Sequence, residues 1–258
     1  IGSSIPEDSI MIRRHLVSSF LFASLLGATT LGCSGTDSQS LEPLAVPDGC
    51  NPIAFEHDCM LPYPSDYFLV DDAAMPSGKR VALTEAATPM TAAEKHFDVT
   101  ADNPVDGFST HQPIMALFSK GVTAEGVVFH TDDPAKSQLP ESKVLLIDAE
   151  SGQAVPAWGE VDLNASELFE RAFIVRPFSK LDYQKRYIVA LQGILSAKED
   201  GSSGPLAEAP EGFARIRDKK TAGDSVLDPI AARFAWVPSS FSFSQWLVFP
   251  GFRKSALR

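Results

Sequence analysis

The sequence predicts a mainly β protein built around an antiparallel β-sandwich, with an irregular segment before it and short helices after it. Two observations predict this fold. First, six short segments rich in Val, Ile, Leu and Phe follow one another, separated by turn-forming residues: 113–119, 126–131, 143–149, 154–161, 171–177 and 186–193. Second, Ser151-Gly152 between the third and fourth segments is typical of a hairpin turn. Strands this close together favour a sandwich or small barrel over a parallel α/β sheet.

The last of these segments adds a local pattern. In "RYIVALQ" the side chains of Tyr187, Val189 and Leu191 share one face, and Leu181 precedes the tyrosine by six positions. This spacing resembles the signature of fibronectin- and immunoglobulin-like sandwiches, in which the tyrosine ring packs in the core and its hydroxyl binds loop backbone at a corner. An ordinary core tyrosine is the alternative, and both interpretations are structural. We therefore expect an Ig-like antiparallel β-sandwich over residues 106–217.

The flanking segments have other patterns. Residues 51–105 are rich in Pro and Asp and lack a strand or helix period, so we expect an irregular segment that packs on the sandwich, with at most a short helix over 91–97. Beyond residue 204, Pro210 can occupy the first turn of one helix. Asp228 with the following proline can begin a second helix.

Residues 218–258 form a helical and then aberrant tail. Its stretch 235–252 has no charged residue and six aromatic residues, and the chain stops in mid-pattern. A sticky hairpin, a partner-binding tail and a frameshifted stretch of the gene are the alternatives. We favour the frameshift and a truncated product.

The first fifty residues predict an exported lipoprotein. Residues 11–32 combine two arginines with a short apolar run, which is typical of a signal peptide and too short for a membrane span, and residues 1–10 are an upstream extension. The following "TTLGC" resembles a bacterial lipobox, which implies cleavage and acylation at Cys33, although Thr30 stands where that pattern prefers Leu. A plain signal peptide with an incidental cysteine is the alternative. Ser34 is no inner-membrane retention signal, so the resemblance implies an outer-membrane anchor, and residues 33–50 are a flexible tether.

Charge and cysteine content limit the function classes. The net charge of −11 argues against nucleic-acid partners and against electrostatic docking on anionic lipid. Because export leads to an oxidising compartment, we expect Cys50 and Cys59 to form one disulfide that closes a small loop. Two free thiols or half of a metal site are the alternatives.

We expect no catalytic residue, cofactor or metal in this chain. The hydrolase motif Gly-x-Ser-x-Gly is absent, and the nearest stretch, "DGSSGP" (200–205), is interpreted as a loop. The acidic cluster "FEHDC" (55–59) is interpreted as a surface loop beside the disulfide. The segment "ADNPVDG" (101–107) is only faintly similar to a calcium loop, because it lacks the later bidentate Glu. Adjacent carboxylates such as Asp71-Asp72 and Asp132-Asp133 are expected to cap or solvate turns.

Three stretches together carry a family resemblance: "LPYPSDYFLVDD…MPSGKRV", "VDGFSTHQPIMALFSKGV" and "FIVRPFSKLDYQKRYIVALQ". They resemble the N-terminal, non-catalytic module of bacterial extracellular lipases of the virulence-factor type. The resemblance covers residues 60–217 and implies an Ig-like sandwich and a surface location. In that family an α/β-hydrolase domain follows, and the resemblance carries over no catalytic residue to this chain.

Two functions follow as hypotheses. The first is an outer-membrane lipoprotein with a non-catalytic Ig-like module, attached through acylated Cys33 and presenting or supporting a surface protein partner. The second is the N-terminal part of a secreted lipase or carboxylesterase whose hydrolase domain is encoded downstream.

Overall fold

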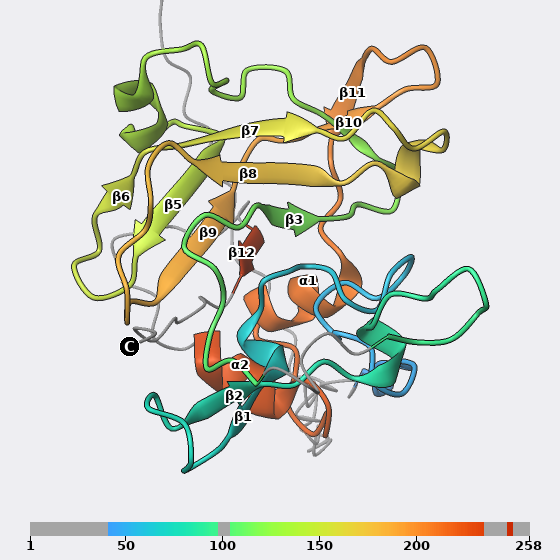
Figure 1. Cartoon of the computed structure of the whole chain (residues 1–258). Helices are drawn as coiled ribbons and strands as arrows, with labels where there is room; N and C mark the ends of the chain where they lie inside the picture. The colour runs from blue at the N-terminus through green and yellow to red at the C-terminus, as the bar shows by residue number, and fades with distance from the viewer. Residues whose placement is uncertain (1–40, 98–103, 235–246, 250–258) are drawn as a thin grey trace, which may run out of the picture. The chain divides into compact units, whose positions relative to one another are not determined.

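The structure is a computed structural model that describes residues 41–97, 104–234 and 247–249, and all the strand pairs it describes are antiparallel (Figure 1). The strands form four sheets. In sheet order these are β12 (Leu247–Phe249), β9 (Tyr187–Leu191), β5 (Val144–Asp148) and β6 (Ala154–Val155); β3 (Ile114–Ala116), β8 (Phe173–Pro177) and β7 (Ala157–Val161); β11 (Ser203–Leu206), β10 (Leu195–Ala197) and β4 (Val122–Thr123); and the pair β1 (Leu69–Asp71) and β2 (Lys79–Val81). The prediction of a mainly β protein with antiparallel sheets is confirmed.

Two short α-helices and four short 3₁₀-helices complete the described elements. The α-helices are α1 (Glu211–Arg217) and α2 (Asp228–Phe234), and the 3₁₀ turns are η1 (Asp66–Phe68), η2 (Glu85–Ala87), η3 (Pro134–Gln138) and η4 (Leu168–Glu170). Both α-helices begin where Pro210 and Asp228 predict. Within the described ranges, no helix has the length and apolar character to cross a membrane.

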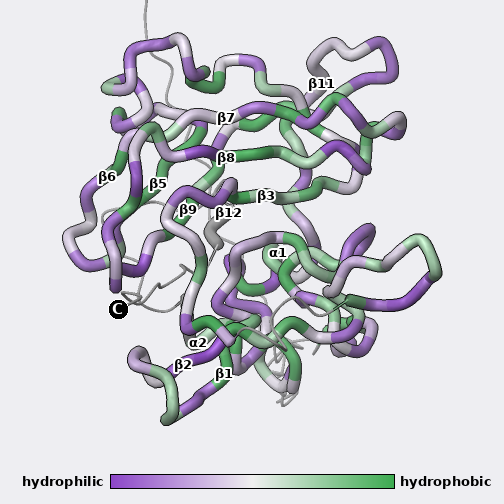
Figure 2. Tube along the Cα trace, viewed as in Figure 1, coloured by the Kyte–Doolittle hydropathy of each residue, from purple (hydrophilic) through white to green (hydrophobic). Residues whose placement is uncertain are grey.

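The hydrophobic core centres on β5 and β9. Every residue of these two strands is buried, including the positions that alternate to the second face, so both faces are covered. The strands β7 and β8 instead bury every second residue at their centres, which is the pattern of a sheet with one open face. In Figure 2 the hydrophobic stretches of β3 and β8 run side by side, as their pairing requires.

The loop before β9 has the arrangement that the leucine–tyrosine spacing predicts. Tyr187 is only 3% exposed, and its hydroxyl oxygen accepts a hydrogen bond of 3.0 Å from the backbone N–H of Asp182. Leu181 is buried, and its N–H donates to the carbonyl oxygen of Thr110 at 3.2 Å. Burial raises the pKa of the Tyr187 phenol above its ordinary value, so the hydroxyl stays protonated. The predicted position of this ring and its hydroxyl is confirmed.

Three of the six predicted strands are confirmed as β5, β8 and β9, and a fourth, 154–161, is divided into β6 and β7. Pro156 separates β6 from β7, because proline has no N–H to donate to a neighbouring strand. The predicted turn at Ser151-Gly152 joins β5 to β6, with Gly152 at a φ of +70°.

The predicted strand over 126–131 is wrong. This segment makes local turns, in which the N–H of Phe129 donates to Asp132 Oδ2 at 2.8 Å and the N–H of Asp132 donates to the Phe129 carbonyl at 2.9 Å. The strand lies earlier, at β4, and of the first predicted segment, 113–119, only β3 is extended. The Gly- and Ser-containing strands β10 and β11 were not predicted, since small polar residues carry little strand signal.

The short helix expected over 91–97 is also wrong. Instead, the chain turns back on itself: a single bridge pairs Met90 with His96, and the N–H of Thr91 donates to the Lys95 carbonyl at 2.8 Å. Glu94 has a φ of +55°, which interrupts any right-handed helix. Of the predicted tail 218–258, the structure describes α2 and β12, and the remaining residues of 235–258 lie outside the described ranges.

Candidate ligand-binding pocket

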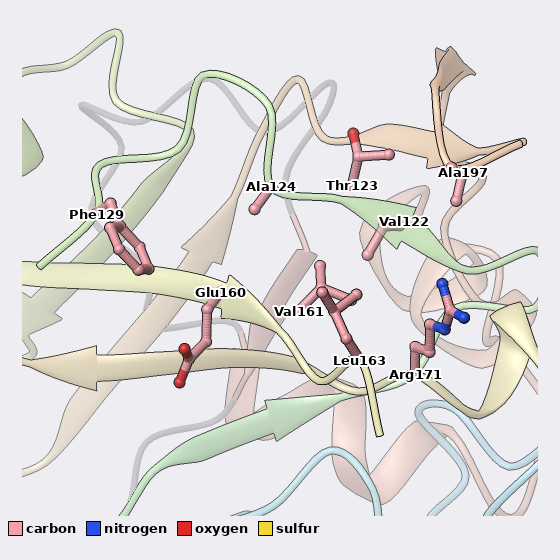
Figure 3. Close-up of a pocket in the computed structure, with 10 residues that line it drawn as sticks. Val122, Thr123, Ala124, Phe129, Glu160, Val161, Leu163, Arg171 and Ala197 are labelled. Carbon is pink, nitrogen blue, oxygen red and sulfur yellow. The ribbon is translucent and has the colours of Figure 1, made fainter. Parts of the chain in front are cut away.

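A pocket of about 600 Å³ opens between β4 and the end of β7 (Figure 3). Its volume is within the roughly 300–1,000 Å³ range of small-molecule sites. Most of its lining is apolar, with one carboxylate and one guanidinium. The lining residues are Val122, Thr123, Ala124, Phe129, Glu160, Val161, Leu163, Arg171, Ala197 and Gly201.

The β4 wall of the pocket depends on a glycine. Gly121 has a φ of +66°, and a Cβ at this position would overlap the carbonyl oxygen of Leu168. Only glycine therefore lets η4 approach the start of β4 this closely. On its other side β4 pairs with β10, and a hydrogen bond of 2.7 Å joins the hydroxyls of Thr123 and Ser203.

The facing wall is the loop that follows β7. Leu163 in this loop is 73% exposed and is the most exposed large hydrophobic residue in the described part of the chain. Arg171 fixes the loop: its Nε donates to the Ala165 carbonyl at 3.0 Å and its Nη2 donates to the Ser166 carbonyl at 3.3 Å. A guanidinium has five N–H donors, so these two bonds leave three. In Figure 3 the guanidinium points toward the side of the pocket where Val122 and Ala197 lie.

Phe129, which lines the other end of the pocket, belongs to an aromatic cluster. Phe129 meets Trp158 edge-on at a ring-centroid distance of 5.5 Å, and His130 lies 4.1 Å from Phe129 and 5.3 Å from Trp158. The guanidinium carbon of Arg176 lies 5.7 Å from the Trp158 ring centroid. Arg176 also forms an ion pair of 2.8 Å with Glu160, so the carboxylate at the pocket has its charge balanced.

A second glycine, Gly159, lets the segment that carries Phe129 lie close against β7. A Cβ at Gly159 would lie 2.8 Å from Val127 and 3.1 Å from the Phe173 ring, so no other residue fits without displacing the core. The N–H of Gly159 donates to the Val128 carbonyl at 3.0 Å. This bond attaches the 126–131 segment to β7 and brings Phe129 to the pocket.

The disulfide predicted between Cys50 and Cys59 is present. It closes a loop that is further bonded by the N–H of Asn51 to the Cys59 carbonyl at 2.8 Å. Cys33 lies outside the described residues, as do the signal peptide, the upstream extension and the tether up to residue 40.

The cluster "FEHDC" forms a surface loop, as the sequence predicts, and its three polar side chains diverge. Glu56 Oε1 accepts a hydrogen bond of 3.1 Å from the first N–H of α1, at Glu211. Asp58 Oδ1 accepts from the two N–H groups that follow the disulfide, at 2.7 and 2.8 Å. The His57 ring lies 4.7 Å from the Phe169 ring. These three side chains hold the loop and do not converge on one point.

The remaining sequence candidates are also structural. In "DGSSGP" only residues 200–202 turn between β10 and β11, and residues 203–205 lie in β11, so the loop interpretation is wrong for this second half. In the turn, Asp200 accepts from the hydroxyl and the N–H of Ser202 at 2.6 and 2.9 Å. These bonds hold the pKa of Asp200 below its ordinary value. Three residues of the calcium-like segment, Ala101, Asp102 and Asn103, lie outside the described ranges. Elsewhere in the described chain, no three His, Cys, Asp or Glu residues gather in a metal-binding arrangement.

Comparisons with family models, with curated proteins and with solved structures find no match for this chain. The functional interpretation therefore depends on the geometry of the site. The sequence did not reveal this pocket, because its residues come from five separate segments: β4, 124–129, β7 with its loop, Arg171 and the β10–β11 hairpin. Gly159 within an otherwise bulky strand was the one sequence signal of a close approach.

Proposed function

We propose that this protein is an exported lipoprotein, anchored at the outer membrane or cell surface, whose Ig-like β-rich part is a non-catalytic binding module. The observation that carries the proposal is the pocket between β4 and β7. Its apolar lining, its aromatic end and its few polar groups form the usual composition of a small-molecule binding site. The pocket walls are set by close backbone approaches at Gly121 and Gly159, so the site is formed before a ligand arrives.

The disulfide supports export. Disulfides persist in oxidising compartments and are rare where thiols are kept reduced. The Cys50–Cys59 bond closes the first loop of the described fold. The predicted tether 33–50 is wrong from residue 41 on, because Leu44 is buried in the core and its N–H donates to Asp224 Oδ2 at 3.0 Å. An anchored chain of this kind would leave at most seven residues, 34–40, between Cys33 and the described fold.

The use of the polar side chains supports binding in preference to catalysis. Asp72 accepts from the N–H of Ala74 at 2.9 Å and Asp133 accepts from the N–H of Ala135 at 3.0 Å, so each caps a turn. Glu56 and Asp58 act in the same way. Within the pocket, Glu160 is paired with Arg176. These carboxylates stabilise the fold. A ligand in the pocket would therefore be bound by the shape of the pocket and by the guanidinium of Arg171.

The anchoring half of the proposal is tested by expressing the chain in a Gram-negative bacterium with a labelled fatty acid. The wild-type chain should take up the label and fractionate with the outer membrane, and Cys33→Ser should remain unlabelled and unprocessed. Cys50→Ser is the matched control, because it removes a thiol outside the lipobox and should still be labelled. A Cys33→Ser chain that carries lipid in the outer membrane contradicts the proposal.

The non-catalytic half is tested with the purified protein and short-chain nitrophenyl esters. We expect no turnover above the rate without protein. Hydrolysis that persists after repeated purification, and that a single substitution abolishes, overturns the non-catalytic assignment and leaves the anchoring result untouched.

A second candidate is the N-terminal module of a secreted lipase or carboxylesterase. The specific observation that favours it is that the three stretches carrying the family resemblance contact one another. The ring of Tyr63, in "YPSD", meets the ring of Phe108, in "DGFS", edge-on at 5.4 Å. Asp66 from the first stretch pairs with Arg186 from the third at 3.1 Å. Motifs more than 40 and about 120 positions apart thus form one connected unit.

Resequencing the gene across and beyond codons 230–258 tests this candidate. A corrected reading frame that continues into Gly-x-Ser-x-Gly with later Asp and His codons would make this chain the front module of a lipase. A confirmed stop after Arg258 excludes it and leaves the binding module as the function.

A further inference from the structure

We propose that the pocket between β4 and β7 binds an amphipathic monocarboxylate, with its apolar body along the pocket and its carboxylate on Arg171. This inference rests on the proposed binding function and specifies the ligand class of the same site. It follows from three properties of the pocket: an apolar middle, one charged group with unused donors, and a balanced carboxylate at the other end.

The middle of the pocket selects an apolar body. Val122, Val161 and Leu163 line it with hydrocarbon, and the side chains of Ala124 and Ala197 add no hydrogen-bonding group. Leu163 is largely exposed, so a ligand that covers it removes hydrocarbon from water. Each buried methylene contributes about 0.8 kcal/mol, which corresponds to about fourfold in affinity.

Arg171 selects the charge of the head group. Its two loop bonds hold the guanidinium in one orientation and leave three N–H donors, for which the structure gives no partner in the described chain. A planar guanidinium binds a carboxylate through two parallel hydrogen bonds. Since Glu160 is already paired with Arg176, the pocket has a net positive charge from Arg171.

The same charges argue for a single negative charge on the ligand. One guanidinium balances one carboxylate, and the chain as a whole carries a net charge of −11. A head with two or more negative charges would face this excess with Arg171 as the one cation among the described lining residues to oppose it. A cationic head would meet Arg171 directly and be repelled.

The test uses the full chain carrying Cys33→Ser, so that no covalently attached acyl chain can enter the pocket. Calorimetric titration compares three probes with the same apolar body: decanoate, decanol and decyltrimethylammonium. We expect decanoate to bind about tenfold or more tightly than decanol, and the cation to bind most weakly. Arg171→Gln should reduce decanoate affinity about tenfold and leave decanol within about twofold, while Lys79→Gln, which removes a positive charge away from the pocket, should change neither.

A pair of substitutions at Leu163 tests whether the head group of the ligand is negatively charged. Neither substitution removes the hydrogen bonds of Arg171 to the Ala165 and Ser166 carbonyls. Leu163→Asp and Leu163→Asn are nearly the same size and differ in charge. Because Leu163 is largely exposed, both variants should fold. The Asp variant should bind decanoate about fivefold more weakly than the Asn variant, with the difference shrinking at high salt, and both should bind decanol equally.

The outcomes separate the two proposals. If decanoate and decanol bind equally, and the two Leu163 variants do not differ for decanoate, the carboxylate assignment is wrong while the binding module stands. If none of the three probes binds, the pocket takes no amphipathic ligand of this kind and the inference fails, while the anchoring tested with Cys33→Ser is unaffected.

Discussion

The segment from residue 41 to 97 and the strands from residue 113 to 206 are held together by different kinds of bond. In the strand region, pairing runs without a break from Val144–Leu191 to Asp148–Tyr187 and from Ala157–Pro177 to Val161–Phe173. The N-terminal segment has one short hairpin, β1–β2, and depends on individual side chains that bind backbone groups. Many backbone hydrogen bonds of the same kind thus hold the strand region, and a few side-chain hydrogen bonds hold the N-terminal segment.

Asn51 illustrates the second kind of bond. It is completely buried, its Nδ2 donates to the Pro62 carbonyl at 3.1 Å, and its Oδ1 accepts from the N–H of Ile53 at 3.2 Å. At the start of the segment, Asp224 Oδ2 accepts from the N–H of Leu44 at 3.0 Å. A single substitution can remove such a bond, whereas in a strand ladder it mainly changes the packing. The two regions should therefore respond differently to mutation.

The largest effect is expected from the core of the strand region. Phe173→Ala removes a ring that is 1% exposed and that contacts the position of Gly159. We expect a loss of about 3–5 kcal/mol in the free energy of unfolding, measured by urea denaturation. The loss should appear in every part of the described fold at once, because this core is shared. A loss confined to the strands would mean that the two regions unfold independently.

The next effect comes from the disulfide. Cys50→Ser should lower the free energy of unfolding by about 2.5–3 kcal/mol, because it frees a loop that spans nine positions. Hydrogen exchange should show the largest loss of protection at residues 50–62, where the freed loop also opens locally, while β5 and β9 lose no more than the global loss of about 2.5–3 kcal/mol. A loss in β5 larger than that at residues 50–62 would contradict the distinction between the two regions.

Gly212 tests the contact of α1 with the N-terminal loop. A Cβ at this position would overlap the Pro52 carbonyl, and the neighbouring N–H of Phe213 donates to the Ile53 carbonyl at 3.0 Å. Gly-to-Ala normally stabilises a helix by about 1 kcal/mol, but here we expect a loss of about 1–3 kcal/mol. The reverse change at an exposed helix position, Ala232→Gly, should cost at most about 1 kcal/mol. A more stable Gly212→Ala protein would show that α1 does not press on this loop.

The smallest effect is a pH dependence in the strand region. Asp148 is 7% exposed; burial would raise its pKa, but hydrogen bonds from Lys185 and from the N–H groups of Ser151 and Glu150 outweigh burial and hold the pKa below its ordinary value. Its contribution to stability is therefore present above the unfolded pKa of about 3.9 and is lost as the pH falls through the folded pKa. Asp148→Asn should lower the unfolding free energy by about 1–2 kcal/mol at pH 7 and by less at pH 3. An equal loss at both pH values would contradict the lowered pKa.

The sequence predicted the strand region better than the N-terminal segment. The reason is again that paired strands hold the first region and bonds between individual distant residues hold the second. The apolar residues that predict β5, β8 and β9 lie within these strands, where they can be read locally. The Tyr187 corner is likewise signalled by the six-residue spacing from Leu181. The anchors of the N-terminal segment join distant positions, such as Leu44 and Asp224, 180 positions apart, and no local pattern encodes them. The pocket was missed likewise, since a turn at Phe129 replaces the predicted strand.

The anchored, exported module is tested most directly by the intact mass of the protein recovered from the membrane of a Gram-negative host. We predict a chain that begins at Cys33, carries acyl groups on that residue, and lacks two thiol hydrogens because Cys50 and Cys59 are joined. A soluble chain that retains residues upstream of Cys33, with all three cysteines unmodified, would contradict the account.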